Sequence, residues 1–135
     1  VRDCVFPLLG GHDRIHLIDP VDVEEMHNLI ARCYMVMTDS GGLQEEAPAL
    51  GKPVLVMRRE TERPEAIAAG TAKLAGVEKE EIVKLANELL DDPAAYAGMA
   101  KAVNPYGDGH ASERIVQAIL WHFGRTEQKP ADFMA

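Results

Sequence analysis

The sequence predicts an α/β fold in which a parallel sheet is covered by helices on both faces. The apolar runs at residues 34–38 and 53–57 are too short for helices and suit buried strands, and residues 71–74 are expected to form a further strand. Apolar residues recur at helical spacing between and after these strands. Strands that alternate with helices pair in parallel through right-handed crossovers, and 135 residues suit one such domain.

Three elements are expected before the strand at 34–38. An apolar patch over residues 5–9 ends at Gly10-Gly11, which is typical of a helix with a glycine stop. Residues 15–18 are predicted to form a strand. Asp22 is predicted to cap a helix whose apolar face carries Val23, Met26, Ile30 and Cys33.

The central part alternates strands and helices. The strand at 34–38 leads into a helix that should kink or end near Pro48 and stop at Gly51. Both this strand and the strand at 53–57 are expected to be buried on both faces. Pro64 favours the start of a short helix, and Gly70 is expected to end it before the strand at 71–74.

The last part of the chain is predicted to be helical. One helix carries the apolar face of Ile82 and Leu89, and Asp92-Pro93 separates it from the next helix. A loop follows over 104–109. Ser112 is predicted to cap a final helix, and residues 126–135 are expected to be a disordered tail. The residues of the final helix expected to face inward are Ile115, Val116, Ile119, Leu120 and Phe123.

Net charge and composition exclude two classes of partner. The formal net charge is −8, whereas nucleic acids and anionic membranes bind positive surfaces. A small anionic ligand remains compatible, because backbone amides bind phosphate even within an acidic protein. Two cysteines and the lack of a signal-peptide pattern or a ~20-residue apolar run favour a cytoplasmic protein. The chain begins with Val1, which suggests a piece of a longer protein.

The turn after the strand at 34–38 is the most informative position for function. Ligands of parallel α/β sheets bind beyond the carboxyl ends of the strands. Asp39-Ser40-Gly41-Gly42 lies there, and glycines followed by a helix start allow a phosphate to approach backbone amides. Turn geometry alone explains such glycines equally well. Glu45 and Glu46 follow in the first turns of the helix, where a carboxylate either accepts ribose hydroxyls or offsets the helix dipole.

Longer motifs around this turn resemble a known family. The segment 38–48, Thr-Asp-Ser-Gly-Gly-Leu-Gln-Glu-Glu-Ala-Pro, is similar to the signature of the non-hydrolysing UDP-N-acetylglucosamine 2-epimerases. The similarity continues in order through Leu-Gly-Lys-Pro-Val-Leu-Val at 50–56, Thr-Glu-Arg-Pro-Glu-Ala at 61–66 and Asn-Pro-Tyr-Gly-Asp-Gly at 104–109. Four ordered matches over nearly the whole chain make the resemblance specific.

The resemblance implies a fold and a set of ligand contacts. It implies part of the C-terminal, Rossmann-like half of a two-domain fold of the GT-B (glycosyltransferase-like) type, with residues 1–125 as the UDP-binding portion. In its implied strand order 3-2-1-4-5-6, residues 15–18 would be strand 3 and the later strands would be 4, 5 and 6. Ser40, Gly41 and Gly42 would bind the UDP pyrophosphate, Glu46 the ribose hydroxyls, and Arg63 a phosphate or sugar group. Met26 would be an apolar wall near uracil, where the family usually has an aromatic or apolar residue.

The resemblance also implies the reaction and the missing parts. The family inverts C2 of the sugar, interconverting UDP-GlcNAc and UDP-ManNAc by UDP elimination and re-addition, with acid and base groups on both faces of the ring. It places those groups upstream of Val1, so no catalytic residue is assigned to this chain, and the isolated chain is expected to be an inactive isomerase fragment. No metal or cofactor is implied. The expected partners are UDP or UDP-GlcNAc, the protein's own N-terminal domain and a second copy in a homodimer.

Two other functions stay open from the sequence. A UDP-sugar glycosyltransferase of the same fold group would use a similar nucleotide site, and a non-catalytic UDP-binding module would use the site without chemistry.

Loss of strands 1 and 2 of the implied fold would expose the edge of the strand at 34–38. We therefore expect the isolated chain to be unstable or to self-associate through that edge.

Overall fold

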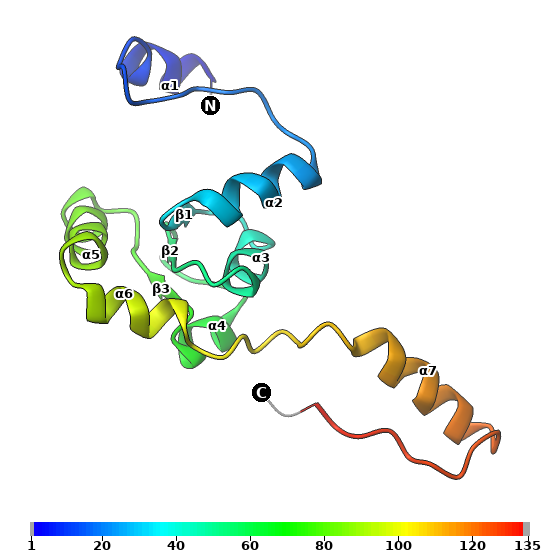
Figure 1. Cartoon of the computed structure of the whole chain (residues 1–135). Coiled ribbons are helices and arrows are strands. Elements are labelled where there is room, and N and C mark those ends of the chain that lie inside the picture. The colour runs from blue at the N-terminus through cyan, green and yellow to red at the C-terminus, as the bar shows by residue number, and fades with distance from the viewer. Residues whose placement is uncertain (1, 134–135) are drawn as a thin grey trace.

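The computed structural model describes residues 2–133 (Figure 1). A three-stranded sheet with flanking helices forms its centre, while the first and last helices lie apart from the sheet. The helices and strands, in chain order, are α1 (Arg2–Leu9), α2 (Val23–Arg32), β1 (Val36–Thr38), α3 (Leu43–Ala49), β2 (Val54–Val56), α4 (Pro64–Ala69), β3 (Ala72–Leu74), α5 (Lys79–Asp91), α6 (Pro93–Ala100) and α7 (Ala111–His122).

The sheet has the predicted parallel pairing. The strand order is β1-β2-β3, with Val36 opposite Val54 and Val54 opposite Ala72. The three strands lie where the sequence predicted strands 4, 5 and 6, although each is shorter than its predicted range. Because consecutive strands are neighbours and parallel, α3 and α4 serve as the crossover connections.

Helices cover both faces of the sheet, as predicted. On one face, Val54 and Val56 pack against residues of α2, α3 and α4. On the other face, Leu55 packs against Leu89 of α5 and Met99 of α6. The whole of β2 is buried, which confirms the prediction for the strand at 53–57.

The prediction of burial on both faces is wrong for the strand at 34–38. Met37 is 38% exposed. It shares a face with Leu55, its register partner, but β1 is the first strand of the sheet and the cluster formed with α5 and α6 is centred on Leu55. An edge position therefore leaves Met37 incompletely covered.

Local signals at helix ends are confirmed in most cases. The Asp22 carboxylate accepts a hydrogen bond from the Glu25 amide at 2.8 Å and caps α2. Asp92 caps α6 in the same way, with Pro93 as the first helical residue. Gly70 ends α4 with a φ of 78°, a left-handed conformation that costs glycine little.

Three predictions about the ends of the chain are wrong. Residues 15–18 form no strand, because no described segment pairs with them, and Ile18 is 61% exposed. Ser112 does not cap α7, since it lies inside the helix and His110 occupies the N-cap position without a side-chain bond. The apolar residues of α7 do not face inward, because α7 lies away from the sheet (Figure 1). The five residues predicted to face inward are each exposed by 40% or more: Ile115, Val116, Ile119, Leu120 and Phe123.

The described part of the expected tail runs back beside α7 (Figure 1). The Gln117 side-chain amide donates to the Gln128 carbonyl at 2.9 Å, and the Arg114 guanidinium lies 5.6 Å from the centre of the Phe133 ring. No helix or strand occurs over 126–133. The last two residues of the predicted tail, 134 and 135, and Val1 at the other end lie outside the described residues.

Candidate functional site

The turn over residues 39–42 lies at the carboxyl end of β1. The loop over 57–63 follows β2, the strand beside it. Because parallel strands end at the same edge of a sheet, the two segments adjoin, and the Gln44 side chain of α3 hydrogen-bonds to both. This edge is therefore where the structure brings most of the predicted site residues together.

The glycines in the turn allow side chains from elsewhere to approach the backbone closely. Neither Gly41 nor Gly42 has a positive φ, so left-handed geometry is not what requires them. A Cβ on Gly41 would overlap the Glu62 carboxylate, and a Cβ on Gly42 would lie 3.3 Å from Glu46 Oε1. The turn is thus a position of close approach, the property that phosphate binding to backbone amides requires.

Ser40 does not cap the following helix. The N-cap position of α3 is Gly42, and no side-chain hydrogen bond caps it. The Ser40 backbone amide donates instead to Thr38 Oγ1 at 3.0 Å. Capping is therefore not the role of the Ser40 hydroxyl in this structure.

Glu46 lies between α2 and the glycine turn. One carboxylate oxygen is beside Gly42, and the other lies 3.1 Å from Nε2 of His27 on α2. The side chain is 38% exposed, so the carboxylate remains accessible to a ligand. No role for His27 was predicted from the sequence, because a single histidine on a helix does not indicate which residue it faces.

Arg63 is held beside Glu45 at the start of α4. Its Nε donates to Glu45 Oε1, and its side chain is one-third exposed. The hydrogen bond to Glu45 raises the pKa of Arg63 above its ordinary value, so the guanidinium is always charged. A cation already paired with a carboxylate can exchange that partner for a phosphate without changing its protonation.

Gln44 is a residue whose role the sequence did not predict. It is completely buried, and its side chain joins the turn to the neighbouring loop. Its Nε2 donates to the Ser40 carbonyl at 3.2 Å, and its Oε1 accepts from the Thr61 hydroxyl at 2.5 Å. One feature of the sequence does indicate that Gln44 is buried. It lies three residues before Ala47, which is also buried, and residues three apart share one face of a helix.

Tyr106 brings the loop over 104–109 close to the same edge. Its ring packs against the cluster that contains Ala66 of α4. Its hydroxyl is buried, and no described residue accepts or donates a hydrogen bond there. Burial raises the pKa of Tyr106, with smaller contributions from Glu65 and Glu45, so the hydroxyl stays protonated at neutral pH.

Met26 is positioned differently from the other predicted residues. It lies on α2, partly buried against the cluster around Ile30 and Ala47. It adjoins His27, which contacts Glu46. The structure therefore gives Met26 a core-packing role next to the site, and any contact with a base remains a prediction.

The loop over 104–109 is anchored to α7 by an ion pair that predicts a pH effect. Arg114 donates to both carboxylate oxygens of Asp108, at 2.7 and 2.6 Å. Together with the His110 amide, it holds the pKa of Asp108 well below its ordinary value of 3.8. A carboxyl with a depressed folded-state pKa stabilises the fold above its unfolded-state pKa, and the stabilisation is lost as the pH falls towards the folded-state pKa.

We therefore expect Arg114→Gln to raise the Asp108 pKa towards 3.8 and to reduce stability at neutral pH more than at pH 2. NMR titration of the Asp108 carboxyl measures the shift. Arg32→Gln is the control, since Arg32 bonds to Asn28 rather than to a carboxylate. An unchanged Asp108 titration in Arg114→Gln would show that the ion pair does not form in solution.

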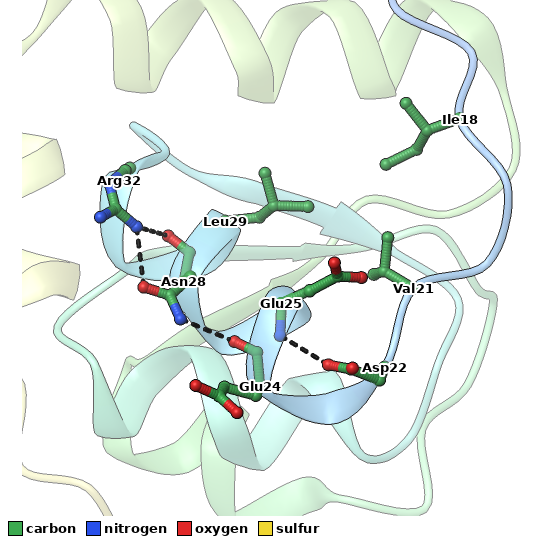
Figure 2. A pocket seen from close by; sticks show the side chains of 8 residues that line it. All are labelled: Ile18, Val21, Asp22, Glu24, Glu25, Asn28, Leu29 and Arg32. Carbon is green, nitrogen blue, oxygen red and sulfur yellow. Dashed lines mark hydrogen bonds between the residues drawn. The ribbon is translucent and has the colours of Figure 1, made fainter.

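A groove runs along α2 (Figure 2), and no residue of the glycine turn lines it. It has a volume of about 640 Å³ and runs beside the extended segment at Ile18 and Val21. Asp22 caps α2 within it, and Asn28 and Arg32 bond to each other (Figure 2). Glu24 and Glu25 add two further carboxylates. This acidic lining disfavours an anionic ligand, so the groove does not compete with the turn as a phosphate site.

Two further properties concern membranes and metals. Among residues 2–133, no helix combines the length and the apolar character needed to cross a membrane. Within the same range, no three or more His, Cys, Asp or Glu side chains are grouped so that they could hold a metal ion.

The parallel sheet covered on both faces, with a glycine turn at the carboxyl end of a strand, defines a Rossmann-like α/β unit. The family model described as "UDP-N-acetylglucosamine 2-epimerase" matches residues 1–120. The chain belongs to the UDP-N-acetylglucosamine 2-epimerase family.

Individual relatives agree with this assignment. A UDP-N-acetylglucosamine 2-epimerase of Bacillus subtilis is 53% identical over 98% of this chain and 35% of its own length. The structure of S. aureus MnaA with UDP is similar with a TM-score of 0.92 and 50% identity, over 98% of this chain and 36% of that one. A Neisseria meningitidis UDP-GlcNAc 2-epimerase bound to UDP-GlcNAc gives a TM-score of 0.82 at 46% identity, over 88% of this chain and 33% of that one.

The extent of these matches defines what the chain represents. The chain spans about a third of the length of the relatives it matches. Those structural neighbours have a GT-B-like fold, and this chain corresponds to part of it.

Proposed function

We propose that residues 1–125 form part of the UDP-binding half of a non-hydrolysing UDP-N-acetylglucosamine 2-epimerase. The observation that supports this most is the single sheet edge that holds the glycine turn, the accessible Glu46 carboxylate and the Arg63 guanidinium. One solved relative is a co-structure with UDP, and another is bound to UDP-GlcNAc. These ligands contain a phosphate pair, a ribose and a base, which this edge suits.

Each proposed contact follows from the chemistry of its group. Backbone amides and the hydroxyl of the turn at Ser40, Gly41 and Gly42 bind the pyrophosphate. Glu46 accepts hydrogen bonds from both ribose hydroxyls, exchanging or sharing its contact with His27. Arg63 exchanges Glu45 for a phosphate oxygen, and its charge stabilises UDP as the leaving group. Met26 is an apolar wall near the uracil ring.

The chemical step requires groups beyond these. In the proposed reaction a base removes the C2 proton of UDP-GlcNAc and an acid assists departure of UDP, which leaves a glycal. UDP then returns to C1, and a proton is delivered to the opposite face of C2, giving UDP-ManNAc. The proposed partners that complete this site are an N-terminal domain of the same protein and, in the assembly, a second copy. The proposed location is the cytoplasm.

Product analysis tests the proposal. The longest natural polypeptide that contains this chain is incubated with UDP-GlcNAc in D₂O, without any acceptor. We expect UDP-ManNAc with deuterium at C2, because the returning proton comes from a solvent-exchanged acid. Sugar transfer that occurs exclusively when an acceptor is added would instead identify a glycosyltransferase, and UDP binding without either product would identify a binding module.

A further inference from the structure

A hydrogen-bond network centred on the buried side chain of Gln44 joins the two segments of the proposed UDP site. The Gln44 side chain is completely buried. It donates to the Ser40 carbonyl at 3.2 Å and accepts from the Thr61 hydroxyl at 2.5 Å. The same hydroxyl oxygen accepts from the Arg63 backbone amide at 3.0 Å. The network therefore runs without a break from the glycine turn to the residue that carries the guanidinium.

The donors and acceptors in this network can be arranged in one way. The Ser40 carbonyl can only accept, so the Gln44 amide nitrogen must face it. The amide oxygen then faces Thr61, whose hydroxyl must donate to it while accepting from the Arg63 amide. Breaking either bond of the Gln44 side chain would leave one of its buried polar atoms without a partner.

We propose that Gln44 and Thr61 are positioning residues that set the separation between the Ser40–Gly42 turn and Arg63. This inference rests on the function proposed above. The turn follows β1 and the loop follows β2, so each could move with its own strand and helix. A diphosphate that contacts both the turn amides and the guanidinium needs that gap to be fixed before it binds, because ordering it during binding would reduce affinity.

Thr71 provides a matched control for a merely structural role. Thr71 is buried, whereas Thr61 is part-buried, and the Thr71 hydroxyl donates to the Ala66 carbonyl at 3.2 Å. It immediately precedes β3, at the amino ends of the strands, whereas the proposed site lies at the carboxyl ends. Replacing either threonine with valine removes one hydrogen-bonded hydroxyl at nearly constant volume. Both variants should therefore lose stability, and Thr61→Val alone should lose UDP affinity.

The experiment measures UDP affinity by calorimetry and the melting temperature by scanning calorimetry, in the longest natural polypeptide that contains the chain. We expect Thr61→Val to raise the Kd for UDP about tenfold, because small misplacements of binding groups are costly. Thr61→Ser keeps the hydroxyl and should restore the affinity to within about twofold. Thr71→Val should lower the melting temperature about as much as Thr61→Val does, with the Kd for UDP unchanged.

A second variant strengthens the test. Gln44→Met removes both side-chain bonds of Gln44, and combined with Thr61→Val it should weaken UDP binding no further than the stronger single change. Equal Kd values in Thr61→Val and Thr71→Val would overturn the positioning role, as would failure of both Thr61→Val and Gln44→Met to melt cooperatively. A wild-type protein that does not bind UDP would instead overturn the proposed function, and the positioning role with it.

Discussion

The 135-residue chain by itself is expected to convert UDP-GlcNAc to UDP-ManNAc at least about ten-thousandfold more slowly than the longest natural polypeptide that contains it. The reason is chemical. Inversion at C2 needs proton transfer on both faces of the sugar, and each positioned acid or base contributes about 10²–10⁴-fold. The groups at this sheet edge are proposed to bind UDP, and a guanidinium that never deprotonates cannot act as the base.

Coupled detection of UDP-ManNAc, with both polypeptides at equal concentration, measures this difference. Size-exclusion chromatography of the 135-residue chain accompanies it, because β1 is an edge strand among the described residues and Met37 is part-exposed there. Comparable rates for the short and long forms would show that the acid and base groups lie within this chain.

Glu46→Ala is expected to weaken UDP binding by about tenfold to a hundredfold. Hydrogen bonds to a charged group contribute about 1.5–3 kcal/mol each, and about 1.4 kcal/mol corresponds to a factor of ten in Kd. The Glu46 carboxylate lies against Gly42 and is accessible, so its loss removes a ligand contact with little effect on the core. Calorimetric titration with UDP measures the change.

His27→Ala tests whether Glu46 acts as a ligand for the ribose or by holding α2 against α3. It removes the 3.1 Å contact between the imidazole and the carboxylate but leaves the carboxylate in place. UDP affinity should stay within about twofold, because a half-exposed pair of this kind contributes little. A second comparison uses UDP and its 2′-deoxy analogue, which should bind Glu46→Ala with nearly equal Kd values. If His27→Ala weakened UDP binding as much as Glu46→Ala, Glu46 would act by holding α2 against α3.

The sequence predicts those parts of the fold that depend on neighbouring residues in the chain. Asp22 and Asp92 cap their helices, and Gly70 ends α4, because the groups that they satisfy are one to four residues away. The strand predicted at 15–18 depends on a pairing partner, and none of the described residues supplies one. The inward face predicted for α7 likewise depends on a surface against which it can pack, and α7 lies away from the sheet (Figure 1).

The same distinction applies to the site. The residue types after the strand at 34–38 predict the glycine turn and a nearby carboxylate, whereas the roles of Glu46 and Arg63 come from the family resemblance. The structure locates the turn and the Arg63 loop at one sheet edge. The role of Gln44 was missed, because a polar residue near a helix start is usually solvated. Its partner Thr61 lies 17 residues further along the chain. The hydrogen bond between Gln44 and Thr61 is a tertiary contact, and the spacing of apolar residues along the chain does not predict such contacts.

The most direct test of the account is a residue-by-residue map of where UDP binds. The measurement is a ¹⁵N NMR titration of the polypeptide with UDP, with inorganic phosphate as the control ligand. We predict that the largest shift changes occur at the amides of Ser40, Gly41 and Gly42, with further changes at Glu46 and Arg63. Changes centred on the α2 groove at Val21 and Leu29, or no saturable change anywhere, would contradict the proposed UDP site at the glycine turn.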